Sequence, residues 1–290
     1  MLRGVKHSRR PDAIGDAVAL VQSNPHAAYL GGGAWIVAQG DPSLQMVVDL
    51  QDLGIGAIET RLLEQSSAME VSIGAMATLQ TLIDHPDTGS LADGLLARAA
   101  GYVQSRTLRE QGTVGGALMT AGFEDPLTTA LLVLDTEIYY ADPVLHKAPF
   151  MSFVAYRDRL IHSRVLLTEV RVRQPSGRSA AAFEVVGRSP KDKPIVCAAA
   201  YLEVSEGLPS AVRLAVGGAH TQPVRLHKTE HILRGQLLTG DRIDNALAPS
   251  LADLAPPADF RGSADYRLSM AQVLARRAVS AAWQAARRRG

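Results

Sequence analysis

The chain has 290 residues, of which 47% are hydrophobic and 20% charged, and its formal net charge is +1. A chain of this length can bury a large core and commonly divides into two domains or closely packed subdomains. The near-zero charge gives no electrostatic basis for binding nucleic acid or an anionic membrane.

Cys197 is the only cysteine. A single thiol excludes an internal disulfide, an all-cysteine zinc site and an iron–sulfur cluster, which needs several thiolates. Redox chemistry on this chain would therefore need an organic cofactor. No apolar run approaches the roughly 20 residues that span a bilayer. The basic residues 1–11 lead into no apolar signal core, so we expect a cytoplasmic protein without a membrane span.

The first half of the chain alternates helical and β-like patterns. Apolar residues at helical spacing predict a helix at 12–22, which Asn24-Pro25 ends. Asp125 and Pro126 suit the N-cap and first residue of a helix that continues to about 134. Strands are expected at 28–30, 46–50, 69–73 and 137–141, and further helices at 78–83 and 91–103.

The second half has a different pattern, in which β-like runs separated by Gly, Pro and Ser predict an antiparallel sheet. The runs are 165–172, 183–186, 195–204 and 211–216. After Gly217-Gly218 the pattern becomes helical, and the last helix is expected at about 263–288. We place a domain boundary near Pro175-Ser176-Gly177. The predicted domains are 1–175, with subdomains of about 1–55 and 56–175, and 176–290.

Two glycine clusters are the strongest candidates for a binding site. Gly31-Gly32-Gly33 follows a short strand, and Gly115-Gly116 follows Thr113-Val114. Glycine lets a phosphate approach backbone N–H groups closely, and successive N–H groups in a concavity bind anions. Two such loops facing each other could hold a pyrophosphate without a lysine. Neither cluster matches the P-loop or the G-x-G-x-x-G fingerprint.

Motifs for other chemistry are weaker. His227-Lys228-Thr229-Glu230-His231 matches the H-x-x-E-H pattern of inverted zinc peptidases, but a solvated helix face is the simpler interpretation of so short a pattern. Cys197 lies in an apolar run, where a cysteine is usually an inert core residue. Glu124 and Asp125 are adjacent, so they do not form a glycosidase-like acid/base pair by themselves.

Several motifs occur in an order that points to one family. They are Leu30-Gly31-Gly32-Gly33, Val48-Asp49-Leu50 with Leu53, Ile73-Gly74-Ala75 with Thr78-Leu79, Arg109 with Thr113-Val114-Gly115-Gly116, Leu131-Leu132 with Leu134, Arg188 with Asp192, and Arg261-Gly262-Ser263-Ala264 with Tyr266-Arg267. Over nearly its whole length the chain resembles the FAD-binding (medium) subunit of the xanthine dehydrogenase and carbon monoxide dehydrogenase family, the molybdenum hydroxylases.

The resemblance implies an α+β fold. A two-part FAD-binding domain of the vanillyl-alcohol oxidase/p-cresol methylhydroxylase type would be followed by a smaller C-terminal domain of antiparallel strands and helices. It also implies an electron-transfer flavoprotein with no catalytic residue of its own. Electrons would come from a 2Fe–2S small subunit, which receives them from a large subunit with the molybdenum cofactor. They would leave to an acceptor such as NAD or a quinone.

The resemblance further implies that both glycine loops bind the FAD pyrophosphate through backbone N–H groups. The candidate FAD-binding residues are Leu30, Gly31, Gly32, Gly33, Ala34 and Trp35 in the first loop, Thr113, Val114, Gly115, Gly116, Ala117 and Thr120 in the second, Glu124 and Asp125 as polar contacts, and Leu166 and Leu167 against the flavin ring.

The chain departs from the family pattern at positions that usually carry polar side chains. Ala117 replaces the usual Asn, Gly33-Ala34 replaces Thr/Ser-Asp/Glu, and Val185 replaces a frequent Lys. Each hydrogen bond lost in this way is worth about 0.5–1.5 kcal/mol. The departures motivate an alternative, a flavin-free or weakly binding subunit that keeps the fold to hold its partners. A stand-alone flavin oxidase would share the flavin-domain fold, but no His or Tyr can be assigned as its substrate base.

Overall fold

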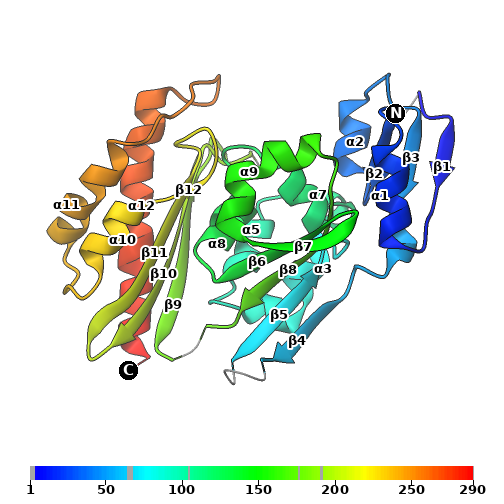
Figure 1. Ribbon diagram of the computed structural model, residues 1–290. Coiled ribbons are helices and arrows are strands. Elements are labelled where there is room, and N and C mark those ends of the chain that lie inside the picture. The colour runs from blue at the N-terminus through cyan, green and yellow to red at the C-terminus, as the bar shows by residue number, and fades with distance from the viewer. Residues whose placement is uncertain (1–3, 64–67, 104, 176, 190–191, 290) are drawn as a thin grey trace. The chain divides into compact units, whose positions relative to one another are not determined.

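The computed structural model describes residues 4–63, 68–103, 105–175, 177–189 and 192–289. They form two compact units, each assembled from three segments (Figure 1). Unit 1 comprises Met1–His85, Ser105–Thr120 and Thr136–Val172, and unit 2 comprises Pro86–Gln104, Ala121–Asp135 and Arg173–Gly290. Both units combine helices with sheets, which confirms the predicted α+β class. The domain division near residue 175 stays a prediction, and Ser176 lies outside the described residues.

Unit 1 begins with a small parallel sheet of order β1-β3-β2. Its strands are β1 (His7–Arg9), β2 (Ala27–Leu30) and β3 (Met46–Asp49). Helix α1 (Ile14–Gln22) buries Ala17, Val18 and Val21 in an apolar cluster that includes Val48 of β3. The predicted helix at 12–22 is therefore confirmed, because its apolar face has a sheet to pack against.

The second sheet of unit 1 has the order β4-β5-β8-β6-β7. The strands are β4 (Ile58–Leu62), β5 (Met69–Gly74), β6 (Thr136–Asp142), β7 (Val144–Pro149) and β8 (Leu166–Arg173). Strand β6 pairs antiparallel with both β7 and β8. Helix α3 (Leu79–Asp84) follows β5, and α9 (Phe150–His162) follows β7.

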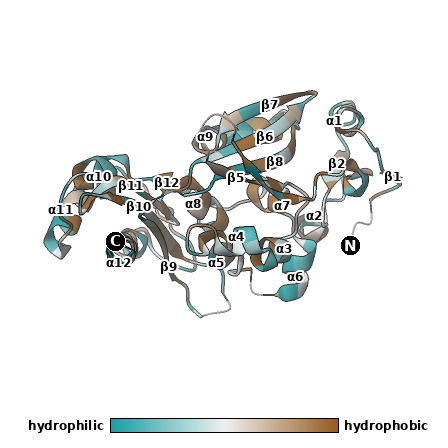
Figure 2. Ribbon diagram, turned by 90° about the horizontal axis from the view of Figure 1, so that it is seen from below, coloured by the Kyte–Doolittle hydropathy of each residue, from teal (hydrophilic) through white to brown (hydrophobic). Residues whose placement is uncertain are grey.

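Three further short helices of unit 1 bear on the candidate site. They are α2 (Ala34–Gln39), α6 (Arg106–Gln111) and α7 (Val114–Met119), and the 3-10 turn η1 (Gln51–Leu53) follows β3. Helix α6 is mostly hydrophilic and buries no residue (Figure 2). Such short, exposed segments lack the apolar periodicity that makes a helix predictable.

Unit 2 is built on an antiparallel sheet of order β12-β11-β10-β9, which confirms the sheet predicted for 183–216. The run 165–172 was expected with it but forms β8 in the five-stranded sheet of unit 1, where it pairs with β6. Its strands are β9 (Ser179–Val186), β10 (Val196–Ser205), β11 (Leu208–Gly217) and β12 (Val224–Arg225). Helices α10 (His227–Leu233), α11 (Gly240–Leu251) and α12 (Ala264–Arg288) lie together on one face of this sheet (Figure 1). No helix in the described part of the chain is long and apolar enough to cross a membrane.

The helices α4 (Pro86–Ser90), α5 (Leu95–Ala100) and α8 (Pro126–Leu132) complete unit 2. The Asp125 side chain accepts a hydrogen bond from the Thr128 N–H at 2.7 Å, so the predicted N-cap is confirmed. The helix predicted at 91–103 is shorter than expected. Ala92, Asp93 and Gly94 have φ of 47°, 61° and 71°, and this left-handed turn delays the start of the helix.

Candidate functional site

The first glycine cluster connects β2 to α2. Gly33 has φ of 80°, the left-handed conformation that favours glycine, and it turns the chain from the strand into the helix. Among the described residues, no acceptor binds the backbone N–H groups of Gly31, Gly32 and Gly33. Gly32 is also exposed. Three successive donors are therefore available to an anionic group.

The second glycine cluster begins a helix, whereas the sequence suggested a loop. After α6, Thr113 caps α7 and its hydroxyl accepts a hydrogen bond from the Gly116 N–H at 3.1 Å. Both glycines of this cluster are helical. The loop prediction was wrong because glycine signals a turn locally, whereas the capping threonine and distant acceptors fix a helix here.

The backbone N–H groups of this second turn already have acceptors inside unit 1. The pairs are Val114 N–H to Ala77 O (2.8 Å), Gly115 N–H to Ala75 O (2.8 Å), Gly116 N–H to Thr113 Oγ1 (3.1 Å) and Ala117 N–H to Thr113 O (2.9 Å). The two glycine clusters therefore differ, since only the first presents unbonded amides within the described chain.

The two glycine clusters lie in direct contact. A Cβ on Gly32 would overlap the backbone carbonyl of Gln111, and a Cβ on Gly31 would lie 3.0 Å from Thr113 Oγ1. A Cβ on Gly115 would likewise lie 2.9 Å from the Ala75 side chain. Close packing of these turns thus requires glycine.

The region around these turns suits a phosphate-containing cofactor. Gly116 is exposed, and a Cβ there would meet only Thr113 Oγ1, at 3.0 Å. Thr168 of β8 is 5% exposed, and its hydroxyl is buried without a hydrogen-bond partner in the described chain. The Thr168 carbonyl accepts a hydrogen bond from the Ala75 N–H at 2.9 Å, and the Ala75 carbonyl accepts one from the Gly115 N–H. Strand β8 is therefore linked to the second glycine turn through Ala75. An unpartnered buried hydroxyl is uncommon and leaves a donor for a ligand.

The remaining candidates of the two turns flank this region. Leu30 ends β2 and Ala34 begins α2. Trp35 is 52% exposed, which is unusual for so large an apolar side chain. The Thr120 hydroxyl donates to the carbonyl of Gly116 at 2.8 Å and thus closes the last turn of α7.

Leu166 and Leu167 begin β8 and are only 3% and 4% exposed. Leu166 belongs to the apolar cluster of unit 1 that contains Val18 and Val48. Its burial is explained by core packing, and a contact of either leucine with the flavin ring stays a prediction.

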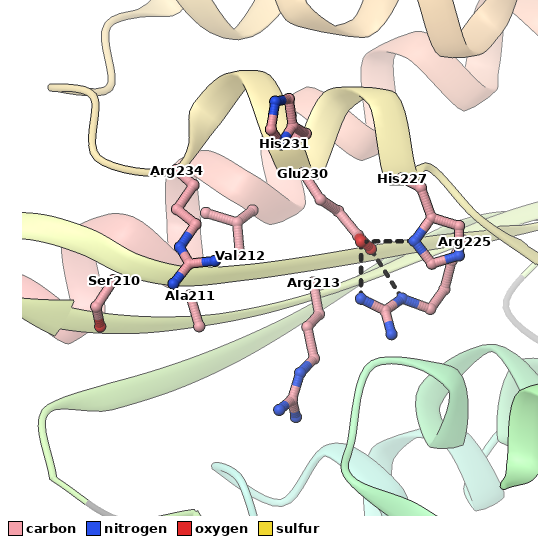
Figure 3. Close-up of a pocket in the computed structure, with 9 residues that line it drawn as sticks. All are labelled: Ser210, Ala211, Val212, Arg213, Arg225, His227, Glu230, His231 and Arg234. Atoms are coloured by element: carbon pink, nitrogen blue, oxygen red, sulfur yellow. Dashed lines mark hydrogen bonds and ion pairs between the residues drawn. The ribbon is translucent and has the colours of Figure 1, made fainter.

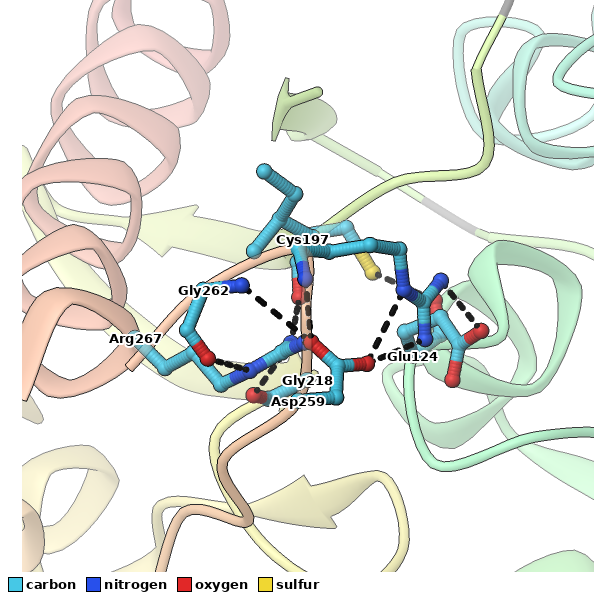
Figure 4. Close-up of polar contacts among 8 residues, drawn as sticks. Glu124, Cys197, Gly218, Asp259, Gly262 and Arg267 are labelled. Atoms are coloured by element: carbon cyan, nitrogen blue, oxygen red, sulfur yellow. Dashed lines mark hydrogen bonds and ion pairs between the residues drawn. The ribbon is translucent and has the colours of Figure 1, made fainter. Parts of the chain in front are cut away.

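The carboxylates Glu124 and Asp125 belong to unit 2, where both have partners (Figure 4). Glu124 is 8% exposed and accepts a hydrogen bond from Arg261 Nη1 at 2.9 Å. Asp125 caps α8. The chain itself thus uses both side chains, and their role toward a cofactor stays a prediction.

Arg267, the last residue of the Arg-Gly-Ser-Ala-x-Tyr-Arg motif, is completely buried in unit 2. Its guanidinium donates to Asp259 Oδ1 at 2.6 Å and to the carbonyls of Ile195 and Gly218 at 2.5 and 3.3 Å (Figure 4). Asp259 also accepts from the Arg261 side chain at 3.0 Å. Burial raises the pKa of Asp259, but these hydrogen bonds outweigh burial and hold the pKa well below its usual range.

We expect Asp259→Asn to lower the free energy of unfolding by about 2 kcal/mol at neutral pH, because a charged hydrogen-bond acceptor is lost. The depressed pKa means that the carboxylate stabilises the fold above the ordinary aspartate pKa, and that this contribution disappears as the pH falls through the folded-state pKa. The difference between wild type and variant should therefore shrink steadily below about pH 4. Urea titrations across this range measure it, and a difference independent of pH would contradict the assignment.

Cys197 is fully buried in β10, with Sγ 3.4 Å from Thr129 Oγ1. Burial raises the pKa of this thiol to about 12, so almost no nucleophilic thiolate exists at neutral pH. We expect the native protein to show no reactive thiol in a titration with an aromatic disulfide reagent, and one thiol per chain after unfolding in urea. Rapid reaction of the native protein would show that this part of unit 2 opens readily.

The residues of the zinc-peptidase pattern, 227–231, lie in helix α10. Glu230 of α10 is 7% exposed and binds Arg225 and His227, whereas His231 is exposed. In the described ranges, no group of three or more His, Cys, Asp or Glu is placed to hold a metal ion.

Two contributors to the candidate site were missed at the sequence level. The backbone carbonyl of Gln111 lies against Gly32, and a residue of any type at position 111 would place a carbonyl there. Thr168 lies in a strand that was predicted, but only the register of the sheet shows that its hydroxyl is buried without a partner. No local pattern identifies either of them.

Comparison with known proteins relates both halves of the chain to the same kind of protein. Residues 5–175 match the family model of the FAD binding domain in molybdopterin dehydrogenase, and residues 181–282 match the CO dehydrogenase flavoprotein C-terminal domain. The carbon monoxide dehydrogenase medium chain of Afipia carboxidovorans is 28% identical, over 97% of this chain and 98% of the relative. The nicotine 6-hydroxylase medium subunit of Paenarthrobacter nicotinovorans is 27% identical, over 93% and 94%.

A solved structure shares the fold. A chain of the carbon monoxide dehydrogenase from Hydrogenophaga pseudoflava superimposes with a TM-score of 0.88 at 24% identity, and the match covers 98% of this chain and 99% of that one. Together with the two family models, this match confirms the predicted FAD-binding fold followed by a C-terminal domain of the CO dehydrogenase flavoprotein type.

Proposed function

We propose an electron-transfer role for this chain, which belongs to the family of FAD-binding medium subunits of molybdenum hydroxylases. It is the flavoprotein component of an oxidoreductase, and FAD is its cofactor. Bound FAD supplies the redox chemistry, and the protein supplies binding, orientation and electrostatics. In our proposal electrons arrive from iron–sulfur clusters of a partner and leave to an external acceptor such as NAD or a quinone.

The cysteine content supports the assignment of the iron–sulfur clusters to a partner subunit. Cys197 is the only cysteine and is buried, so the chain has no set of thiolates for an iron–sulfur cluster. We therefore assign the 2Fe–2S clusters to a small subunit, and the molybdenum cofactor and substrate oxidation to a large subunit. Relatives named medium chain and medium subunit support such a complex. The compartment we propose is the cytoplasm, where a lone thiol stays reduced.

The observation that carries the proposal is the set of unbonded amides at the first glycine turn. Gly31, Gly32 and Gly33 would donate to the pyrophosphate, and the second turn would hold them in place through Gln111 and Thr113. Leu30, Ala34 and Trp35 would flank the phosphates, and the helical segment Thr113–Thr120 would line the other side. Such binding depends on the backbone, which is why it tolerates the small residues at positions 33, 34 and 117.

The visible absorption spectrum of the purified chain tests this proposal, alone and after co-expression with its molybdenum and iron–sulfur partners. We expect flavin bands, release of FAD on denaturation, and loss of the bands in Gly116→Trp. Gly116 is exposed beside the first turn, so an indole there would occupy the space of the cofactor.

Gly15→Trp is the matched control, because Gly15 is exposed on α1 and a Cβ there meets no atom within 4 Å. This variant should keep its flavin. Reoxidation of the reduced holoprotein by NAD or a quinone then identifies the acceptor. A colourless protein that still co-purifies stoichiometrically with the molybdenum subunit would contradict electron transfer and favour a flavin-free subunit that holds its partners together.

A further inference from the structure

Unit 2 contains a pocket between helix α10 and the outer edge of strand β11 (Figure 3). Its volume is about 330 Å³, and its lining includes three arginines, two histidines and one carboxylate. Neither the family motifs nor the proposed FAD site uses these residues. The arrangement of charge in this lining indicates what the pocket would bind.

Glu230 is the only carboxylate among the described residues of the pocket lining, and its oxygens are fully engaged. It accepts hydrogen bonds from Arg225 Nε and Nη2 at 2.9 and 2.7 Å, from the Leu214 N–H at 2.8 Å and from His227 Nδ1 at 3.0 Å. Glu230 therefore cancels the charge of Arg225 and fixes its orientation. It does not oppose an incoming anion as an isolated carboxylate would.

The other two arginines of the lining, Arg213 and Arg234, are not neutralised by a direct ion pair in the described ranges. The guanidinium of Arg213 lies 5.2 Å from the ring centre of Tyr201, a cation–π contact that restrains it. Figure 3 shows Arg234 and Arg225 toward opposite ends of the pocket, whereas the Arg213 side chain leaves β11 between them and points away from α10. The pocket thus has a net positive lining.

The edge of β11 adds a backbone donor. Strand β12 pairs with β11 only at Ala215 and Val216, and the outward N–H of Leu214 binds Glu230. Outward-facing N–H groups alternate along an antiparallel strand, so Val212, two residues earlier, also faces the pocket edge. No partner strand covers Val212 on this side in the described part of the chain.

We propose that this pocket binds the phosphate group of a small phosphorylated molecule. Guanidinium groups match phosphate oxygens geometrically, and donors from several directions suit a tetrahedral oxyanion better than a planar carboxylate. Two of the three arginines are already held by Glu230 and Tyr201, so binding costs little ordering of side chains. The pocket volume falls within the range of small-molecule sites and leaves room for more than the phosphate.

Isothermal titration calorimetry of the holoprotein with inorganic phosphate tests the proposal, at constant ionic strength set with chloride. We expect saturable binding that weakens at least tenfold in Arg234→Gln. Arg234 is exposed and pairs with no carboxylate in the described chain, so the fold should be unaffected. Arg277→Gln, an equivalent change at an exposed arginine of α12, should bind as wild type. Arg225 stays intact because its loss would leave Glu230 buried without its main partner.

Arg213→Gln provides a second test and should weaken phosphate binding to a similar extent. Equal phosphate affinity in wild type, Arg234→Gln and Arg213→Gln would overturn the proposal, as would the absence of saturable binding. Acetate that binds as tightly as phosphate would also overturn it, because the pocket would then show no preference for a tetrahedral oxyanion.

Discussion

Replacing Gly32 by alanine is expected to remove FAD from the protein and to destabilise unit 1. The added Cβ would overlap the backbone carbonyl of Gln111, which cannot move aside as a flexible side chain can. One of the two turns must shift, and overpacking of this kind costs about 1–3 kcal/mol or more. The shift displaces the unbonded amides of Gly31 and Gly33. We expect the ratio of flavin to protein to fall at least tenfold, measured by absorbance after purification and gel filtration.

Gly15→Ala is the control for this effect. Gly15 is exposed within α1 and a Cβ there meets no neighbour, so alanine should leave the flavin content unchanged and stabilise the helix by about 0.5–1 kcal/mol. Normal flavin content in Gly32→Ala, together with an unchanged midpoint of thermal unfolding, would show that the two glycine turns are not packed as described.

The second large effect is expected at Arg267. Arg267→Met should lower the free energy of unfolding by about 3–5 kcal/mol, because a completely buried guanidinium that donates to a carboxylate and to buried backbone carbonyls is lost. Asp259 would lose its closest donor, and the carbonyls of Ile195 and Gly218 would lose theirs. Denaturant titrations followed by circular dichroism measure the loss.

Two further variants make this test specific. Arg267→Lys keeps the charge but not the planar guanidinium that donates to Asp259 and to three backbone carbonyls, so it should recover only part of the stability. Arg277→Met changes an exposed arginine of the same helix and should cost less than about 0.5 kcal/mol. If Arg267→Met were no more costly than Arg277→Met, the buried network would not be the main constraint on this part of unit 2.

Helices α8 and α12 were predictable because their signals are local, whereas α9, a helix of 13 residues, was not expected from the sequence. Helix α12 was expected at about 263–288 from its apolar periodicity, and Ser263 caps it. Helix α8 was expected from Asp125 and Pro126. In contrast, α2, α6 and α7 contain only 6 residues each, and their positions depend on tertiary contacts. A sequence pattern carries no information on such contacts.

The sequence predicted which segments form the candidate site, but not which of their backbone N–H groups remain free to bind a ligand. The sequence motifs indicated that the Gly31 and Gly115 clusters belong together, and the structure shows them in contact. Which amides remain unbonded depends on the acceptors Ala75 and Ala77, which lie about 40 positions away in the chain and approach only through the sheet. The burial of Arg267 depends in the same way on carbonyls at Ile195 and Gly218.

Because unit 2 is assembled from three segments of the chain, it cannot complete its fold until the last segment has been synthesised. Helix α8 leaves the ribosome early, yet six of its seven residues are buried and it packs on strands β10 and β11, which are synthesised much later. Until then its apolar face has no native cover, and exposed apolar surface on a nascent chain favours chaperone binding or aggregation. Cutting the chain at residue 175 would leave this helix permanently without its sheet.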